Sequence, residues 1–318
     1  MKLLVTGADG FVGGWLVRRL LAGGHEVTGT YREGAPPSRV LSAAERDAVP
    51  WRALELRDPA SVTGALAGEW DAVVHLAALA SGADARRDPG GAWEVNAGGT
   101  ARVAEALGGR VAAREGDPLL LLISTGEVYG QSAEPPLPRR EADACAPCSP
   151  YAASKLGSEI AAQEVARRTG LRVIIARAFP HAGPGQDARF ALPALAARIR
   201  LARRVKARAI NTGNLDPVRD ILDVRDVAEA YLALLERGTA GETYNVASGT
   251  GVGLRSVVDR LGQIARWPVI AEHDPALARA GDLRHLVGDP ARLRAATGWA
   301  PRIPLDQTLA DILDAEAD

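Results

Sequence analysis

Tyr151 and Lys155 have the types and the spacing for acid–base chemistry, in the segment Pro150-Tyr151-Ala152-Ala153-Ser154-Lys155. They open a run with strong helical character, and a spacing of four residues places them one turn apart on one helix face. A phenol that donates a proton near neutral pH must be more acidic than its free pKa of about 10. A neighbouring ammonium favours the phenolate, so we expect Lys155 to lower the pKa of Tyr151. The alternative is an exposed pair on an amphipathic helix, because the pattern alone is common.

A hydroxyl and a carboxylate follow an apolar run at residues 119–123, in Ser124-Thr125-Gly126-Glu127-Val128-Tyr129-Gly130. Such a run is typical of a strand that is covered on both faces. The Thr125 hydroxyl at the end of this strand would bridge a substrate oxygen and the phenol of Tyr151. Glu127 adds a carboxylate close to the same point. A Ser or Thr at a strand end is otherwise an ordinary cap.

A glycine turn near the N-terminus predicts a site for a phosphate-bearing ligand. A short apolar strand leads into Gly7-Ala8-Asp9-Gly10-Phe11-Val12-Gly13, and a helical pattern follows. Here Gly7 permits a tight turn, Gly10 lets backbone approach phosphates, and Gly13 allows close packing of helix and strand. The helix N-terminus then offers free N–H groups and a positive dipole to an anion. The alternative is a plain turn between strand and helix.

Arg32 indicates which dinucleotide the turn serves. Enzymes that select NAD usually place an acidic residue near the end of the second strand, where it binds the ribose 2′-hydroxyl. The expected second strand ends Thr30-Tyr31-Arg32, without an acidic residue. A guanidinium suits a 2′-phosphate, so we expect NADP, with NAD as the other possibility. A solvated arginine beside a variable loop is the alternative interpretation of Arg32.

The rest of the chain alternates strand and helix patterns, which indicates an α/β protein with a doubly wound parallel sheet. Strands are expected at 2–6, 25–31, 51–56, 71–76, 119–123, 171–177 and 243–247, and helices at 14–22, 93–107, 152–169, 188–203 and 224–236. Ligands of such sheets bind beyond the carboxyl ends of the strands. Gly7, Arg32, Leu76 and Ser124 each directly follow an expected strand, so we expect them to gather on one edge.

The pattern changes after residue 178, where a turn-rich segment, Phe179-Pro180-His181-Ala182-Gly183-Pro184-Gly185-Gln186, begins. We expect a dinucleotide-binding domain at 1–178, with 213–248 returning to its sheet. A smaller, mainly helical domain would bind the substrate. It would be discontinuous within 179–318, at about 179–212 and 249–318, with the last part mostly short helices and turns.

Composition and charge exclude several classes of function. The chain has 318 residues, 47% of them hydrophobic and 24% charged, with a formal net charge of −1. This balance offers no electrostatic case for nucleic acid or an anionic membrane. No apolar run is long enough to span a bilayer, and the N-terminus has no signal-peptide layout. We therefore expect a cytoplasmic protein.

Two cysteines, Cys145 and Cys148, have the spacing of a redox motif or half of a zinc site. A metal site would need a second Cys/His pair, and thioredoxin-like chemistry would place the pair at the start of a helix after a strand. These cysteines lie in a proline-rich loop, so we interpret them as two loop thiols and expect no metal.

With these motifs in hand, the chain resembles the extended short-chain dehydrogenase/reductase family over essentially its whole length. The matching signatures are Gly7-x-x-Gly10-x-x-Gly13, His75-Leu76-Ala77-Ala78, Asn96-x-x-Gly99-Thr100, Ser124-Thr125 with Val128-Tyr129-Gly130, and Tyr151-x-x-x-Lys155. The resemblance implies a Rossmann domain and a small C-terminal domain that binds a nucleotide-diphosphate sugar. It also implies a homodimer through two helices per subunit, at about 93–107 and 151–169.

Within that family several stretches are similar to GDP-4-keto-6-deoxy-mannose reductases, which make GDP-D-rhamnose. They are Thr125 to Gly130, His181-Ala182-Gly183-Pro184-Gly185-Gln186, Gly213-Asn214-Leu215-Asp216 and Arg219 to Val227. GDP-mannose 4,6-dehydratases share Thr125-x-Glu127, so Glu127 alone does not separate reduction from dehydration. Two residues depart from the pattern. Pro180 stands where Asn is common, and Glu55 replaces an Asp in the pair that holds adenine.

The resemblance also implies roles for individual residues. Tyr151 would protonate the C4 oxygen of the sugar, Lys155 would hold the nicotinamide ribose, and Thr125 would hydrogen-bond the same oxygen, with Glu127 as a further catalytic residue. The cofactor would be bound by Gly7, Gly10, Phe11, Val12, Gly13, Arg32, Glu55, Leu56, Leu76, Ala77, Ala78, Asn96, Ser124, Tyr151, Lys155, Phe179 and His181. The substrate would be bound by Ser81, Thr125, Glu127, Pro180, Arg219 and Arg279. For the last two arginines the alternative is an ion pair with a nearby Asp.

Three functions are compatible with these motifs. The first is an NADPH-dependent reductase of a nucleotide-4-keto-6-deoxyhexose. The second is a nucleotide-sugar 4,6-dehydratase or 4-epimerase, in which the cofactor is reduced and reoxidised within one turnover. The third is a non-catalytic NADP-binding regulator, against which the intact Tyr151, Lys155 and Thr125 argue.

Overall fold

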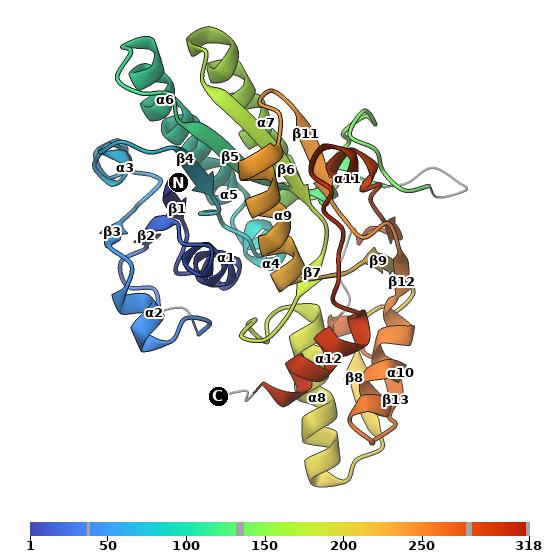
Figure 1. The fold of residues 1–318 in the computed structure, drawn as a ribbon. Helices are drawn as coiled ribbons and strands as arrows, with labels where there is room; N and C mark the ends of the chain where they lie inside the picture. Colours follow the sequence, from blue (N-terminus) through green and yellow to red (C-terminus); the bar gives the residue numbers. More distant parts are fainter. Residues whose placement is uncertain (37–38, 132–136, 278–281, 316–318) are drawn as a thin grey trace.

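The computed structural model describes residues 1–36, 39–131, 137–277 and 282–315, and within them a seven-stranded parallel sheet organises the chain (Figure 1). The strand order is β11-β6-β5-β4-β1-β2-β3. The strands are β1 (Lys2–Thr6), β2 (Glu26–Tyr31), β3 (Trp51–Ala53), β4 (Ala72–His75), β5 (Leu119–Thr125), β6 (Arg172–Ala178) and β11 (Thr243–Val246). The order 3-2-1-4-5-6 is that of the Rossmann fold, and the expected doubly wound sheet is confirmed.

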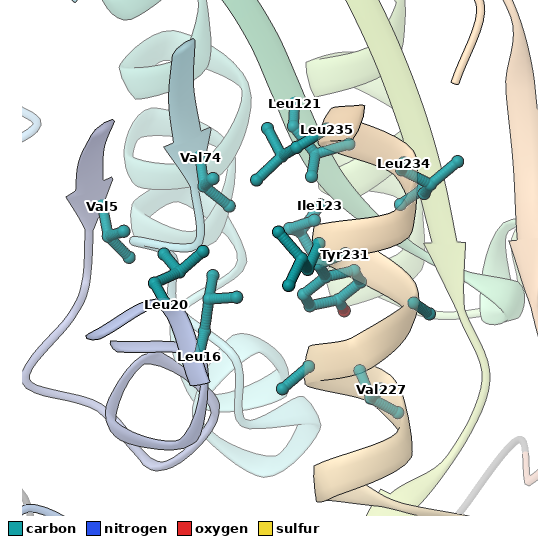
Figure 2. Packing of buried hydrophobic residues seen from close by; sticks show 14 of the residues in the cluster. Val5, Leu16, Leu20, Val74, Leu121, Ile123, Val227, Tyr231, Leu234 and Leu235 are labelled. Carbon is teal, nitrogen blue, oxygen red and sulfur yellow. The ribbon is translucent and has the colours of Figure 1, made fainter. Parts of the chain in front are cut away.

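Helices cover both faces of this sheet, because successive strand residues point to opposite sides. Leu121 and Ile123 pack with α1 (Phe11–Ala22) and α9 (Val224–Arg237), as Figure 2 shows. The other face of β5 packs against α3 (Pro59–Leu66), α6 (Gly99–Ala112) and α7 (Pro150–Thr169). Burying each of these leucine or isoleucine side chains contributes about 1.5–3 kcal/mol. The continuous apolar run of β5 is thus explained by cover on both sides.

Several boundaries differ from the sequence-based predictions, and three of the differences concern predicted site residues. β3 ends at Ala53, so Glu55 and Leu56 lie in the turn that follows it. β5 extends to Thr125, so Ser124 is inside the strand and the prediction that it follows the strand is wrong. The helix expected at 93–107 is interrupted by a π-helical turn, η1 (Glu94–Gly98), between α5 (Pro89–Trp93) and α6. Such turns are frequent at functional sites, and Asn96 lies in this one.

A separate hydrophobic cluster holds the later part of the chain together. It contains buried residues of α8 (Ala191–Val205), α10 (Leu254–Ile264) and α12 (Leu305–Asp314), packed around Ile210 of β8 (Ala209–Thr212). β8 pairs in parallel with β13 (Ile270–His273), a strand that we did not expect among the short helices and turns. Three of its four residues are exposed, so the segment lacks the alternating apolar pattern of a strand with one buried face. The domain boundaries stay a prediction.

Short elements complete the described chain. They are α2 (Ala43–Asp47), α4 (Gly82–Arg87), η2 (Gly126–Tyr129), β7 (His181–Ala182), β9 (Val218–Asp220), β10 (Leu222–Asp223), β12 (Gly251–Gly253), η3 (Pro275–Leu277), β14 (His285–Leu286) and α11 (Ala291–Thr297). β9 lies between β12 and β14, and β7 pairs with β10. Among the described helices, none combines the length and the apolar character that crossing a membrane requires.

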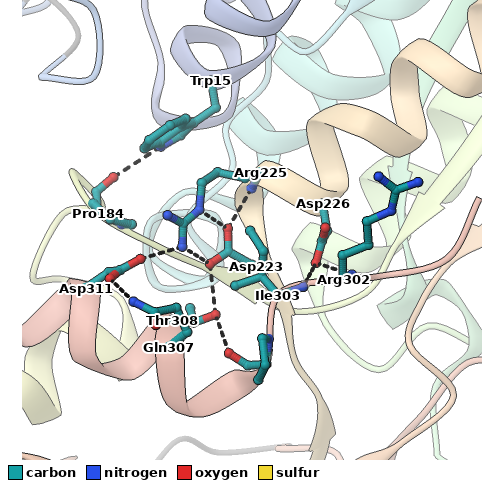
Figure 3. Close-up of polar contacts among 11 residues, drawn as sticks. Trp15, Pro184, Asp223, Arg225, Asp226, Arg302, Ile303, Gln307, Thr308 and Asp311 are labelled. Carbon is teal, nitrogen blue, oxygen red and sulfur yellow. Dashed lines mark hydrogen bonds and ion pairs between the residues drawn. The ribbon is translucent and has the colours of Figure 1, made fainter.

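Polar contacts tie α12 and the turn at 183–185 to the sheet's helices (Figure 3). Trp15 of α1 donates its indole N–H to the carbonyl oxygen of Pro184 at 3.1 Å. Arg225, in the first turn of α9, forms ion pairs with the buried Asp223 and with Asp311 of α12. Asp223 also accepts a hydrogen bond from the hydroxyl of Thr308 at 2.8 Å. This network holds α12 against the N-terminal end of α9.

Candidate active site

Tyr151, Thr125 and Glu127 meet at the carboxyl end of β5. Ser149 caps α7 by accepting a hydrogen bond from the amide of Ala152 at 3.1 Å, which places Tyr151 in the first turn of the helix. Thr125 ends β5 and accepts the amide N–H of Glu127 at 3.2 Å. A side-chain hydrogen bond with Thr125 and the charge of Glu127 both act on the phenol of Tyr151. The structure therefore brings three predicted catalytic side chains together.

The pKa of Tyr151 differs from the sequence-based expectation. Burial, and then the charge of Glu127, raise it above its usual value, and the hydrogen bond with Thr125 opposes the rise only in part. The ammonium of Lys155 donates a hydrogen bond to the carbonyl oxygen of Ile123, 2.5 Å away. The expectation that the pKa of Tyr151 is lowered is wrong for this arrangement, in which it is raised. The phenol is protonated at neutral pH.

Lys155 is 4% exposed, which is unusual for a charged side chain. Burial lowers the pKa of its ammonium to about 8, and the carboxylate of Glu159 opposes the fall. His75 of β4 is close by: burial, and then the charge of Lys155, lower the pKa of His75 to about 3. The neutral imidazole contacts the hydroxyl of Thr6 at 2.8 Å, and the same hydroxyl accepts the amide N–H of Ala77 at 3.2 Å. These contacts join the ends of β1 and β4.

An ion pair between Glu159 and Arg177 lies behind Lys155, and the sequence analysis missed it. The Arg177 guanidinium donates to the Glu159 carboxylate at 2.8 Å, and the two side chains are 8% and 2% exposed. The hydroxyl of Ser124 donates to the same carboxylate. Arg177 also lies over the ring of Tyr129, with 4.8 Å from guanidinium to ring centroid. The Ser124 hydroxyl, expected to face a cofactor, thus points toward α7.

One signal in the sequence could have revealed this network. Glu159 follows Lys155 by four residues, so Tyr151, Lys155 and Glu159 fall on one face of α7. A carboxylate on the same face as an amine and a phenol at a predicted sheet edge is unlikely to point to solvent. Ser154 was also missed: its hydroxyl donates to the carbonyl of Tyr151 and accepts a hydrogen bond from Asn96, which is distant in the chain.

Asn96 joins the loop after β4 to α7. Its side-chain oxygen accepts the amide N–H of Leu79 at 2.8 Å, and its side-chain N–H groups donate to the carbonyl of Leu79 and to the hydroxyl of Ser154. Asn96 is 1% exposed. It therefore fixes the backbone of the segment that contains Leu76, Ala77 and Ala78, rather than presenting its amide to solvent.

The glycine turn fits a dinucleotide. Gly7 has φ of +69°, and a Cβ there would lie 2.8 Å from the amide nitrogen of Ala77. A Cβ on Gly13 would lie 2.2 Å from the carbonyl oxygen of Gly7, so these positions of turn and helix require glycine. Gly10 is the N-cap of α1 and has no side chain to cap it. The amides of Phe11 and Val12 in the first turn are thus placed as an anion site requires.

The expected adenosine end of the site shows two different environments. Arg32 is exposed directly after β2, where a 2′-phosphate could approach it. Glu55 is also exposed, and its carboxylate accepts the amide N–H of Arg57 at 2.9 Å. Leu56 is 5% exposed and packs against Gly99, so its side chain supports this region from within.

The remaining predicted residues are placed less directly. Phe179 is 1% exposed and packs against Tyr129, so its side chain supports the site from within. The half-buried His181 ring contacts the carbonyl of Phe179 at 2.8 Å, and Pro180 is half-buried beside it. Ser81 caps α4 by accepting the amide N–H of Asp84. Arg279 lies outside the described residues.

Arg219 forms an ion pair with an aspartate, as the alternative interpretation of this residue expected. Its guanidinium pairs with Asp282, and its side chain is 13% exposed. It also donates to the carbonyl of Leu283 at 2.7 Å. A diphosphate at Arg219 would have to share the guanidinium with Asp282.

Cys145 and Cys148 are free thiols, and burial raises the pKa of Cys145. Within the described residues, no group of three His, Cys, Asp or Glu side chains is arranged to hold a metal ion.

Comparisons with known proteins extend over almost the entire chain. A model of the NAD dependent epimerase/dehydratase family matches residues 3–247. The GDP-6-deoxy-D-mannose reductase of Pseudomonas aeruginosa is 37% identical over 313 residues, covering 98% of this chain and 96% of that protein. The UDP-glucose 4-epimerase of Mycolicibacterium smegmatis is 31% identical over 324 residues, covering 99% and 98%. The structure of RMD from Pseudomonas aeruginosa complexed with NADPH has a TM-score of 0.84 and 35% identity, covering 99% and 98%.

Proposed function

Because the chain belongs to the NAD dependent epimerase/dehydratase family, we propose that it uses NADPH to reduce the C4 keto group of a nucleotide-4-keto-6-deoxyhexose. The conversion would be of the type that turns GDP-4-keto-6-deoxy-mannose into GDP-D-rhamnose. The resemblance to the extended short-chain dehydrogenases/reductases is confirmed by the family match. Support for the finer assignment comes from the 37% identity to a GDP-6-deoxy-D-mannose reductase.

The observation that carries the proposal is the protonated phenol of Tyr151 beside Thr125. Reduction of a ketone adds a hydride to carbon and a proton to oxygen, and NADPH supplies the hydride when it is bound. Tyr151, whose pKa burial raises, holds a proton at neutral pH and would give it to the C4 oxygen. The hydroxyl of Thr125 would bind the same oxygen and orient it. Such acid catalysis is typically worth 10²–10⁴-fold.

The chain's own residues also fit NADPH. The amides of Phe11 and Val12 would bind the pyrophosphate, and the exposed Arg32 would bind the 2′-phosphate. Lys155, buried at the end of β5, would hold the nicotinamide ribose. The nucleotide-diphosphate sugar would lie between these groups and the helices around β8, in the segments 179–212 and 249–318.

A dehydratase or 4-epimerase is the second candidate, and the position of Glu127 favours it. The carboxylate is close enough to Tyr151 to raise the pKa of the phenol. A base at this place could remove a proton from the sugar during loss of water. Both of these reactions begin with oxidation at C4, for which Tyr151 would have to start as a phenolate.

Product mass and cofactor stoichiometry separate the candidates. With GDP-4-keto-6-deoxy-mannose and NADPH, we expect one NADPH oxidised for each sugar nucleotide, whose mass rises by that of two hydrogens. Loss of water from GDP-mannose without net NADPH oxidation would replace the proposal by a dehydratase. Inversion at C4 without net oxidation would replace it by an epimerase. A parallel series with UDP-, dTDP- and CDP-sugars in a thermal-shift assay would identify the base, because ligands stabilise the folded state by mass action.

We further propose that two copies associate through α5, α6 and α7. Trp93 of α5 is 47% exposed and Ile160 of α7 is 58% exposed, although both are large and apolar. Trp93 packs over Gly157, so both exposed side chains belong to adjoining helices. Sedimentation should give a dimer for the natural protein and a monomer for Ile160→Glu. A monomer in both cases would exclude this interface.

A further inference from the structure

We propose that Glu159 is a positioning residue for Lys155. Glu159 reaches no predicted ligand, because it is 2% exposed and lies behind the lysine on the same face of α7. Its carboxylate accepts hydrogen bonds from Arg177 and from Ser124. Through these contacts it would fix the buried face of α7 against β5 and β6 and so hold the amine of Lys155 at the carbonyl of Ile123.

The arrangement of charge supports this role. The groups that act on Lys155 are Glu159 on its own helix, His75 from β4 and the carbonyl of Ile123 from β5. Arg177 of β6 lies beyond Glu159, and Glu127 of η2 acts on Tyr151. Within this group Glu159 is the carboxylate that favours the charged form of Lys155. Without it, two buried cations would share the end of the sheet without a counter-charge, which strongly disfavours the ammonium.

Ser124 connects Glu159 to the backbone of β5. Its hydroxyl donates to Glu159, and its neighbour Ile123 supplies the carbonyl that Lys155 binds. The end of β5 and the middle of α7 are thereby joined at two successive residues. A shift of α7 along β5 would break both bonds, so the lysine is held in register with the strand that also carries Thr125.

The inference rests on the proposed function only for the role of Lys155 toward NADPH, so its main test is made on the protein without cofactor. The chain has three lysines, Lys2, Lys155 and Lys206. Lysine labelled with ¹³C at Cε therefore gives three NMR signals, assigned through Lys2→Arg and Lys206→Arg. The titration midpoint of Lys155 is then measured directly between pH 6 and pH 11.

Glu159→Gln should lower this midpoint by about one pH unit or more, because the nearby negative charge is lost. The matched control is Glu164→Gln on the same helix, where an exposed carboxylate pairs with Arg168. The control should leave the Lys155 signal unchanged. An unchanged midpoint in folded Glu159→Gln would overturn the proposal.

A double variant, Glu159→Met with Arg177→Met, separates positioning from a merely structural role and also covers the case that Glu159→Gln does not fold. If Glu159 only neutralises Arg177, the double variant should titrate and bind like the natural protein. If Glu159 positions Lys155, the midpoint stays lowered and the Kd for NADPH, measured by fluorescence at pH 8, rises about tenfold or more. Rescue of both readouts in the double variant would contradict the proposal. Failure of the natural protein to reduce any keto sugar, with the Lys155 titration still shifted in Glu159→Gln, would contradict the proposed function alone.

Discussion

Lys155 donates a hydrogen bond to the carbonyl oxygen of Ile123, and this bond joins α7 to the end of β5 at 2.5 Å. A main-chain oxygen carries no net charge, so the bond compensates only part of the cost of burying an ammonium. The amine is nevertheless held where β5 delivers Thr125 and where α7 presents Tyr151. Burial of this ammonium therefore lowers the free energy of unfolding, and the same burial fixes the position of the charge.

The first prediction concerns pH and stability at Lys155. Burial lowers the pKa of its ammonium from 10.5 to about 8, so between these values the unfolded chain binds more protons than the folded one. The free energy of unfolding therefore rises with pH across this window. A shift of about 2.5 units corresponds to about 3 kcal/mol.

Lys155→Met should consequently be more stable than the natural protein at pH 7, by up to about 3 kcal/mol. The advantage should shrink as the pH rises from 8 toward 10.5. Urea unfolding of both proteins at four pH values between 7 and 10.5 measures the difference, in which groups that do not interact with Lys155 cancel. A difference that stays constant with pH would show that the lysine is not buried as a charge.

The second prediction concerns the phenol of Tyr151. Tyr151→Phe should lower kcat/KM for the keto sugar by about 10²–10⁴-fold, because the proton donor is lost. The KM for NADPH should change little, since the ring and the helix remain. Tyr244→Phe is the control. Tyr244 lies in the sheet strand β11, and its hydroxyl accepts the amide N–H of Thr239 at 3.1 Å. Turnover by Tyr151→Phe equal to that of the control would remove Tyr151 from the reaction.

The third prediction concerns Arg32 and the choice of cofactor. A charge-assisted hydrogen bond to a phosphate contributes about 1.5–3 kcal/mol, so Arg32→Ala should raise the KM for NADPH by about 10–100-fold. NADH lacks the 2′-phosphate and is the internal control, and its KM should stay within about twofold. Steady-state rates with both cofactors decide the matter. Equal losses with NADPH and NADH would assign Arg32 to the solvated loop.

The fourth prediction concerns the network around Asp223. Arg225→Met leaves a fully buried carboxylate that retains only its hydrogen bonds to Thr308 and to the main chain, which should cost about 2–4 kcal/mol. Arg260→Met is the control, because it breaks an exposed pair with Asp306 at the start of α12. The control should cost no more than about 1 kcal/mol. Denaturant midpoints for the two variants give the comparison, and equal costs would mean that the buried network contributes no more than a surface pair.

Many strands, turns and helices of this protein could be predicted from its sequence, because they depend on local interactions. The strands β1, β2, β4, β5 and β6, the glycine turn and most of the helix α7 follow from apolar runs, steric freedom at Gly7 and local helical character. Each of these depends on residues within a few positions of one another. The spacing of Tyr151 and Lys155 likewise required only a helix.

Tertiary structure decided what the same side chains do. Lys155 turns to Ile123, and burial together with Glu127 raises the pKa of Tyr151, although a helix face alone predicts a lowered one. Glu159 meets Arg177, and β8 meets β13, only because the chain folds back on itself. A pKa depends on the whole surroundings of a group, and strand pairing depends on a distant partner. Neither property is determined by neighbouring residues. The sequence therefore identified the reactive groups, and the fold determined their pKa values and their partners.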